Sequence, residues 1–162
     1  VSLLALAQQA YNPTVYAMAR KRGTQVYRPL SSEHPDDETW AGLLILRMEG
    51  RLFFANAQGV VERMRSLIDQ ARPSVVLLDC DAVIDIEYTA VKMLIEAERN
   101  LHDAGIALWL VALNPGVLAV VRRTTLAETL GRERMLFNLE TAVERFELTA
   151  VHRPSPQKGA GS

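Results

Sequence analysis

The stretch that decides the fold runs from residue 75 to residue 90 and reads VVLLDCDAVIDIEYTA. It opens with four apolar residues, as expected of a strand that is covered on both faces. Acidic residues follow at once, and from Tyr88 onward apolar residues recur with the period of a helix. We therefore predict a buried strand that ends in acidic and hydroxyl side chains and leads into a helix. Ligands and partners of open α/β sheets bind beyond the carboxyl ends of the strands, so we expect the functional site here.

The segments downstream continue the alternation of strand and helix. The helix that starts near Tyr88 is predicted to end at Ala104, because Gly105 suits a left-handed C-terminal cap. Asn114-Pro115 predicts another helix start, since proline fits the first helical turn. The remaining predicted elements are an apolar strand at 106–112, a short strand at 135–137 and a helix from 139 to about 146.

Upstream, we predict a short strand at 25–28 and a β-hairpin in which residues 43–46 pair with 52–54 across a turn at Gly50. A helix capped by Asn56 follows, because apolar residues between Val60 and Ala71 form one stripe. The order of elements predicts an α/β fold, a layered domain with a mixed central β-sheet, an N-terminal hairpin and about four to five α-helices.

The composition of the chain limits the number of domains and the classes of function that we expect. The chain has 162 residues with 18 basic and 19 acidic side chains, a formal net charge of -1, so one domain is expected and nucleic-acid binding is not. Cys80, the single cysteine, allows no intrachain disulfide and is expected to be buried. The polar, Pro/Gly-rich stretch 151–162 predicts a disordered tail.

Residues 1–23 differ from the rest of the chain. The apolar run Leu3–Ala7 and the basic cluster Arg20-Lys21-Arg22 are typical of the cytoplasmic end of a membrane span, where Lys and Arg concentrate. An amphipathic arm packed on the domain is the alternative.

An enzyme site is not predicted. The segment Leu77-Leu78-Asp79-Cys80-Asp81 resembles the first motif of haloacid-dehalogenase-type phosphatases, in which the first aspartate is the nucleophile. No paired acidic motif follows, however, and Lys92 falls inside a predicted helix. The histidines and Cys80 lack metal-ligand spacing, and no phosphate-binding Gly-rich loop is present. We therefore predict no catalytic residues, no metal and no cofactor.

The remaining functional candidate is a partner- or ligand-binding edge. Glu87 and Thr89 also fit the simpler role of capping groups at a helix start, and the two roles are compatible. The edge consists of Asp81, Asp85, Glu87, Tyr88, Thr89 and Asn114.

Several stretches together resemble the STAS domain, the sulfate-transporter and anti-sigma-factor-antagonist module, and most closely the C-terminal cytosolic domain of bacterial SulP-type anion permeases. The resemblance covers about residues 10–147. The matching stretches are Asn12–Tyr16, Gly23–Arg28, Gly50–Ala57, Ile86–Ala90 and Leu113–Pro115.

The resemblance implies a STAS domain at 24–150, preceded by a linker at 1–23 from the last transmembrane helix and followed by the tail. It implies a non-catalytic regulatory domain of a sulfate transporter on the cytoplasmic face of the inner membrane. The implied partners are the transmembrane domain of the same polypeptide and a cytosolic regulatory protein or nucleotide, with oligomers formed through the full-length transporter.

The alternative is a stand-alone partner-switching protein of the antagonist type. In such antagonists the loop before the corresponding helix reads Asp-Ser-Ser-Gly, and its first serine is phosphorylated. Here Glu87-Tyr88-Thr89-Ala90 occupies that place, with a tyrosine at the switch serine. Thr89 is the aliphatic hydroxyl left in the motif and is therefore the candidate phosphorylation site.

Overall fold

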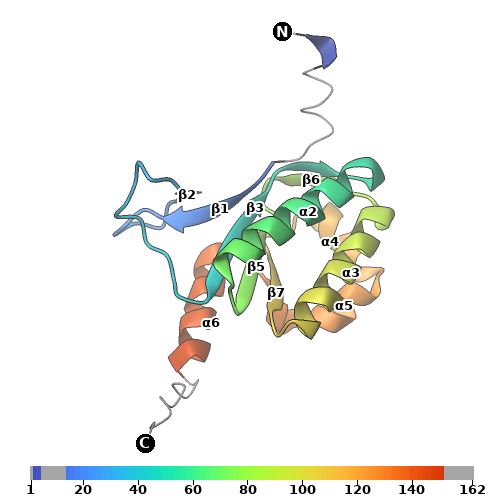
Figure 1. Cartoon of the computed structure of the whole chain (residues 1–162). Helices are drawn as coiled ribbons and strands as arrows, with labels where there is room; N and C mark the ends of the chain where they lie inside the picture. Colours follow the sequence, from blue (N-terminus) through green and yellow to red (C-terminus); the bar gives the residue numbers. More distant parts are fainter. Residues whose placement is uncertain (1, 5–13, 152–162) are drawn as a thin grey trace, which may run out of the picture.

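A computed structural model describes residues 2–4 and 14–151 of the chain. In it a six-stranded sheet has the order β2-β1-β3-β5-β7-β8 (Figure 1). β1 is antiparallel to β2 and β3, whereas β3, β5, β7 and β8 run parallel. The predicted mixed sheet is confirmed. Its strands are β1 (Val15–Arg20), β2 (Tyr27–Pro29), β3 (Leu43–Met48), β5 (Val75–Asp79), β7 (Ala107–Val111) and β8 (Met135–Leu136).

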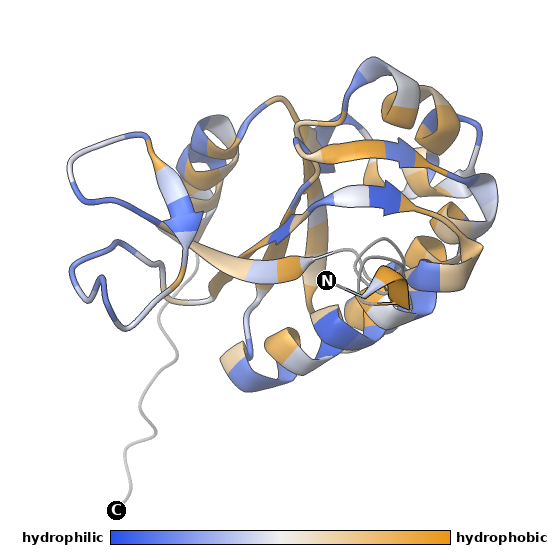
Figure 2. Ribbon diagram, turned by 90° about the horizontal axis from the view of Figure 1, so that it is seen from above, coloured by the Kyte–Doolittle hydropathy of each residue, from blue (hydrophilic) through white to orange (hydrophobic). Residues whose placement is uncertain are grey.

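Helices cover both faces of this sheet. On one face, α2 (Phe54–Ala71), α3 (Tyr88–Asp103), α4 (Pro115–Arg122) and α5 (Thr125–Leu130) enclose a core that includes Leu46, Leu78 and Leu110. On the other face, α6 (Leu139–Val151) packs with Leu77 and Trp109. Consecutive strand residues point to opposite faces, so the apolar run of β5 supplies both cores. Figure 2 shows the resulting hydrophobic colouring of the central strands.

The predicted hairpin between residues 43–46 and 52–54 is wrong. β3 and β4 (Gly50–Leu52) are separated only by Glu49, yet they belong to different sheets. Both edges of β3 are occupied, by β1 and by β5, so no edge remains for β4. β4 instead pairs in parallel with β6 (Val83–Ile86). Gly50, at φ 99°, redirects the chain without reversing it, a conformation that suits glycine.

Two further predicted boundaries change. Residues 83–86, for which no strand was predicted, form β6, and residues 15–20, predicted to lie in the linker, form β1 between β2 and β3. Val15, Met18 and Ala19 of β1 are buried, so this part of the linker belongs to the folded domain. Most of the predicted linker before Thr14, residues 5–13, and residues 152–162 of the predicted tail lie outside the described residues.

The helices predicted at 88–104 and from Asn114-Pro115 are confirmed as α3 and α4, and the one from 139 as α6. α5 and the short 3₁₀ helix η1 (Arg132–Arg134) were not expected from the sequence. In residues 14–151 the chain thus forms five α-helices, α2 to α6, within the predicted range. None of the helices in the described part is both long and apolar enough to span a membrane.

Candidate functional site: a pocket and an exposed sheet end

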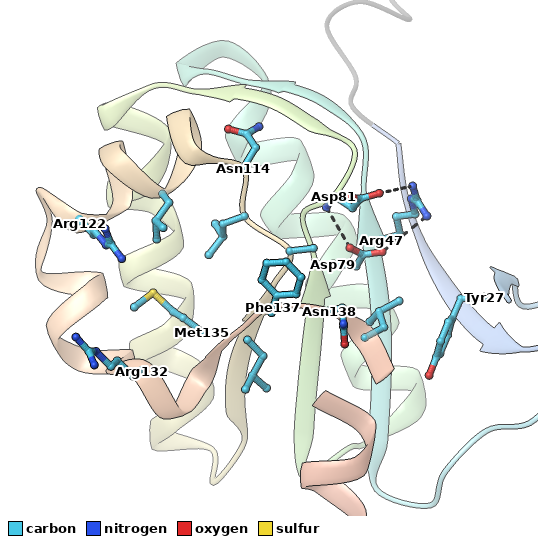
Figure 3. Close-up of a pocket in the computed structure, with 15 residues that line it drawn as sticks. Tyr27, Arg47, Asp79, Asp81, Asn114, Arg122, Arg132, Met135, Phe137 and Asn138 are labelled. Atoms are coloured by element: carbon cyan, nitrogen blue, oxygen red, sulfur yellow. Dashed lines mark hydrogen bonds and ion pairs between the residues drawn. The ribbon is translucent and has the colours of Figure 1, made fainter. Parts of the chain in front are cut away.

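A pocket of about 740 Å³ opens where the parallel strands β3, β5, β7 and β8 end (Figure 3). This is the sheet edge at which the strand order predicts a site. Apolar side chains from the loop after β7, from α4 and from the β8–α6 connection form much of its wall. Its polar lining includes Arg47, Asp79, Asp81, Asn114, Arg122 and Arg132.

Asp79 and Asp81 form one side of the pocket. Asp79 ends β5 and is only 2% exposed, and its Oδ1 accepts the backbone N–H of Asp81 at 3.1 Å. Burial raises the pKa of the Asp79 carboxyl, although the Asp81 N–H and the Arg47 guanidinium oppose this shift. Asp79, which stands at the nucleophile position of the phosphatase-like motif, is therefore buried and held in a turn.

Arg47, near the end of β3, is the cation of this side. Its guanidinium nitrogens lie 3.8 Å from Asp79, 3.7 Å from Asp81 and 3.5 Å from Glu49. Glu49 also accepts a 2.6 Å hydrogen bond from the Tyr16 hydroxyl. The three carboxylates thus share one arginine, and no group of three or more metal-ligating side chains occurs in the described part of the chain.

Cys80 is buried, as predicted. Burial raises the pKa of its thiol to about 12, so the thiolate is scarce at neutral pH and the residue acts as core.

The Asn114 side chain joins β6 of the small sheet to the start of α4. Its Oδ1 accepts the Val117 N–H at 2.9 Å as the N-cap of α4, and its Nδ2 donates to the Val83 carbonyl of β6 at 2.8 Å. The side chain is therefore a structural link between β6 and α4 at the rim of the pocket.

The predicted edge residues divide into two groups. Asp81 and Asn114 line the pocket, whereas Asp85, Glu87, Tyr88 and Thr89 lie on β6 and at the start of α3 and are not among its lining residues. Asp85 pairs with Arg51 of β4 at 3.0 Å, and both side chains are largely solvent-accessible.

The start of α3 is held by backbone groups. Glu87 is the N-cap residue, but its side chain makes no capping hydrogen bond, so the predicted capping by Glu87 is wrong. Its backbone N–H donates to the Leu52 carbonyl at 2.9 Å, which ties α3 to β4. Tyr88 and Thr89 are exposed, and the Lys92 ammonium lies 5.2 Å from the centre of the Tyr88 ring.

Three exposed apolar residues mark what we call the β4–β6 end: Phe54, Ile84 and Tyr88, which are 71%, 73% and 52% exposed. Phe54 and Tyr88 are the first residues of α2 and α3, and each follows the paired strand positions Leu52 and Ile86 by two residues. Since neighbouring strands lie about 4.8 Å apart, the two helices start side by side.

The start of β1 lies beside the first residues of β4 and β6 (Figure 1). The Glu49 N–H donates to the Thr14 carbonyl at 3.1 Å, and the Gly50 N–H donates to the Ala82 carbonyl at 2.9 Å. The described chain therefore resumes, at Thr14, next to the strands that carry the exposed apolar residues.

The pocket residues that sequence reasoning missed include Arg47, Arg122, Arg132 and Phe137. Arg47 had a local signal, a charged residue inside an otherwise apolar strand. Arg122 and Arg132 had no such signal, and Phe137 was predicted to lie in the strand at 135–137. Only the packing of α4, η1 and β8 brings these three to one cavity.

Known proteins share this fold. Sulfate transporter 3.2 of Arabidopsis thaliana is 28% identical over 96% of this chain, which spans 25% of that transporter's length. The murine anion transporter Slc26a9, in the inward-facing state, matches 90% of this chain with 24% of its own at a TM-score of 0.80 and 17% identity. The STAS domain of a SulP transporter from Vibrio cholerae matches 75% of this chain and 94% of its own at a TM-score of 0.61 and 20% identity.

Anti-sigma factor antagonists are also among the matching structures, and their low identity shows a shared fold alone. The predicted resemblance to the STAS module is confirmed by the family comparison. The STAS domain model matches residues 34–145, more than half of the sequence, and the chain therefore belongs to the STAS domain family.

Proposed function

We propose that this chain is the non-catalytic regulatory domain of a SulP-type anion transporter, with sulfate as the first candidate ion, on the cytoplasmic face of the inner membrane. The observation that supports this proposal is the share of the matched transporter that the chain covers. Nearly the whole chain matches a sulfate transporter, but it spans only 25% of that protein. The remainder of such a protein would hold the transport path, and this domain would control it.

The site geometry supports a role without catalysis. A nucleophilic aspartate has to reach its substrate, whereas Asp79 is buried, accepts the Asp81 N–H and lies 3.8 Å from Arg47. Of the histidines in the described part of the chain, His34 lies in a loop and His102 on α3, and neither side chain is hydrogen-bonded to a nucleophile there.

The β4–β6 end is the surface we assign to the transmembrane domain of the same polypeptide. Exposed apolar residues that gather at one end of a domain are typical of an interaction surface. Phe54 and Tyr88 start neighbouring helices there, and Thr14 enters the fold at Glu49, just before the other end of β4. A membrane domain that precedes Thr14 would thus meet the domain on the side where β4 and β6 lie.

Uptake measurements test this proposal. In the full-length transporter we expect Phe54→Ser and Tyr88→Ser to change sulfate uptake or its regulation at unchanged expression, because they remove apolar contacts with the membrane domain. Val26→Ser is the matched control, since Val26 is 55% exposed but lies on the β1–β2 turn. Equal uptake and regulation after deletion of the whole domain would contradict the regulatory role.

A stand-alone partner-switching protein is the second candidate, because antagonist structures match the fold. Thr89 is exposed at the second position of α3, as a phosphorylation site requires. The coding sequence upstream of Val1 separates the candidates: several apolar segments favour the transporter, and a start codon just before Val1 favours the antagonist. Mass spectrometry that finds Thr89 unmodified under all growth conditions would remove the phosphorylation hypothesis.

A further inference from the structure

The pocket at the carboxyl ends of the strands has a basic side that the proposed function does not use. Arg122 ends α4, and Arg132 begins η1. Both side chains lie on the same side of the pocket, away from Asp79 and Asp81 (Figure 3). Both residues are exposed, and within residues 2–4 and 14–151 neither is in an ion pair or a side-chain hydrogen bond.

The opposite side of the pocket carries two carboxylates, Asp79 and Asp81, and one guanidinium, Arg47. Arg47 lies within 3.8 Å of Asp79 and 3.7 Å of Asp81, so the acidic groups there already have a cation. An anion that enters the pocket is therefore attracted to Arg122 and Arg132 and is repelled from the aspartate side. The pocket thus has a defined polarity.

An apolar surface separates the two sides. Leu118, Met135 and Phe137 contribute to it, and Phe137 is 88% exposed with its ring in the pocket (Figure 3). An exposed phenyl ring at the mouth of a partly apolar pocket offers a face on which a flat ligand can pack. The volume, about 740 Å³, lies within the range of roughly 300–1,000 Å³ that small-molecule sites occupy.

We propose that this pocket binds a small organic anion with a flat apolar body and one sulfonate or carboxylate group. Arg122 and Arg132 contact the anionic group, because planar guanidinium groups match its oxygens. Phe137, Leu118 and Met135 contact the body. An inorganic anion would meet only exposed arginines, which bind weakly in water, so the apolar body is required. This inference is independent of the transporter assignment.

Titration of the 162-residue chain with naphthalene-2-sulfonate, followed by calorimetry or NMR shifts, tests the proposal. We expect one site per chain, and affinity about tenfold lower in each of Arg122→Gln and Arg132→Gln, as loss of one charge-assisted hydrogen bond predicts. Phe137→Ala should weaken binding as well. Arg63→Gln, an exposed arginine on α2 outside the pocket, is the matched control and should bind normally.

Three outcomes would overturn the proposal. They are unchanged affinity in the Arg122→Gln/Arg132→Gln double variant, equal affinity for the neutral analogue 2-naphthalenemethanol, and competition by sodium sulfate at the probe's own concentration. Arg122 also lies at the C-terminus of α4, where a cation stabilises the helix. Thermal unfolding of each variant therefore accompanies the titration, and reduced binding at an unchanged melting temperature supports the site.

Discussion

Asp79 is a buried carboxyl whose ionisation opposes folding at neutral pH. Burial raises its pKa, so the folded state holds the proton more tightly than the unfolded chain does. Its contribution to stability is therefore greatest below the ordinary carboxyl pKa, about 3.9, and is lost as the pH rises through the folded-state pKa. We expect Asp79→Asn to gain stability relative to the unsubstituted chain between about pH 4 and pH 7, measured by urea unfolding.

Asp37 provides a control of opposite sign. Hydrogen bonds of 2.7 Å from Arg28 to each of its oxygens lower the pKa of Asp37. Its contribution is present above the ordinary carboxyl pKa and is lost as the pH falls through the folded-state value. Asp37→Asn should therefore lose stability at neutral pH and approach the unsubstituted chain in acid. A pH-independent effect of Asp79→Asn would contradict the first expectation.

Asn114 holds two elements through one side chain, as an acceptor for the Val117 N–H and a donor to the Val83 carbonyl. Asn114→Ala removes both bonds, and we expect it to lower the free energy of unfolding by about 2 kcal/mol. Asn114→Ser keeps an N-cap oxygen and should lose only about 1 kcal/mol. Equal losses in urea unfolding would show that the N-cap bond contributes nothing, and no loss in Asn114→Ser would show the same of the bond to β6.

The helix α3 starts without an acidic residue in its first turn, and Thr89 there is exposed. Free N–H groups give a helix N-terminus a partial positive charge, so Thr89→Glu should be more stable than Thr89→Lys by about 0.3–1 kcal/mol at low salt. The same interaction would favour a phosphate on Thr89. The comparison is repeated near 1 M NaCl, where screening should shrink the difference; an undiminished difference would rule out the electrostatic cause.

The small sheet of β4 and β6 shows why this part of the site escaped prediction. Its strands are short. β6 is hydrogen-bonded along one side to β4, and its Val83 carbonyl accepts a hydrogen bond from Asn114, which belongs to a later segment of the chain. Such a strand is stabilised by its partners more than by its own residues. The sequence predicted a candidate edge, but its division into a pocket and a β4–β6 end could not be predicted from it.

The whole domain depends on β1, which lies between β2 and β3 and buries Val15, Met18 and Ala19. A chain that starts at Thr14 keeps every strand of the sheet, and we expect it to melt cooperatively. A chain that starts at Thr24 loses β1, separates β2 from β3 and exposes an edge of β3, so we expect loss of the cooperative transition or aggregation. Circular dichroism melts compare the two; identical melting would exclude β1 from the folding unit.

The sequence by itself determined the elements that carry their own pattern. β5 and β7 are continuous apolar runs, and α2 and α3 place their apolar residues on one stripe, so local chemistry and family resemblance suffice for an α/β STAS domain. Only the tertiary structure decided that β3 pairs with β1 and β5, and that Arg122, Arg132 and Phe137 meet at one pocket. Periodicity reports on neighbours in the chain, whereas strand pairing and pocket formation depend on contacts between distant segments.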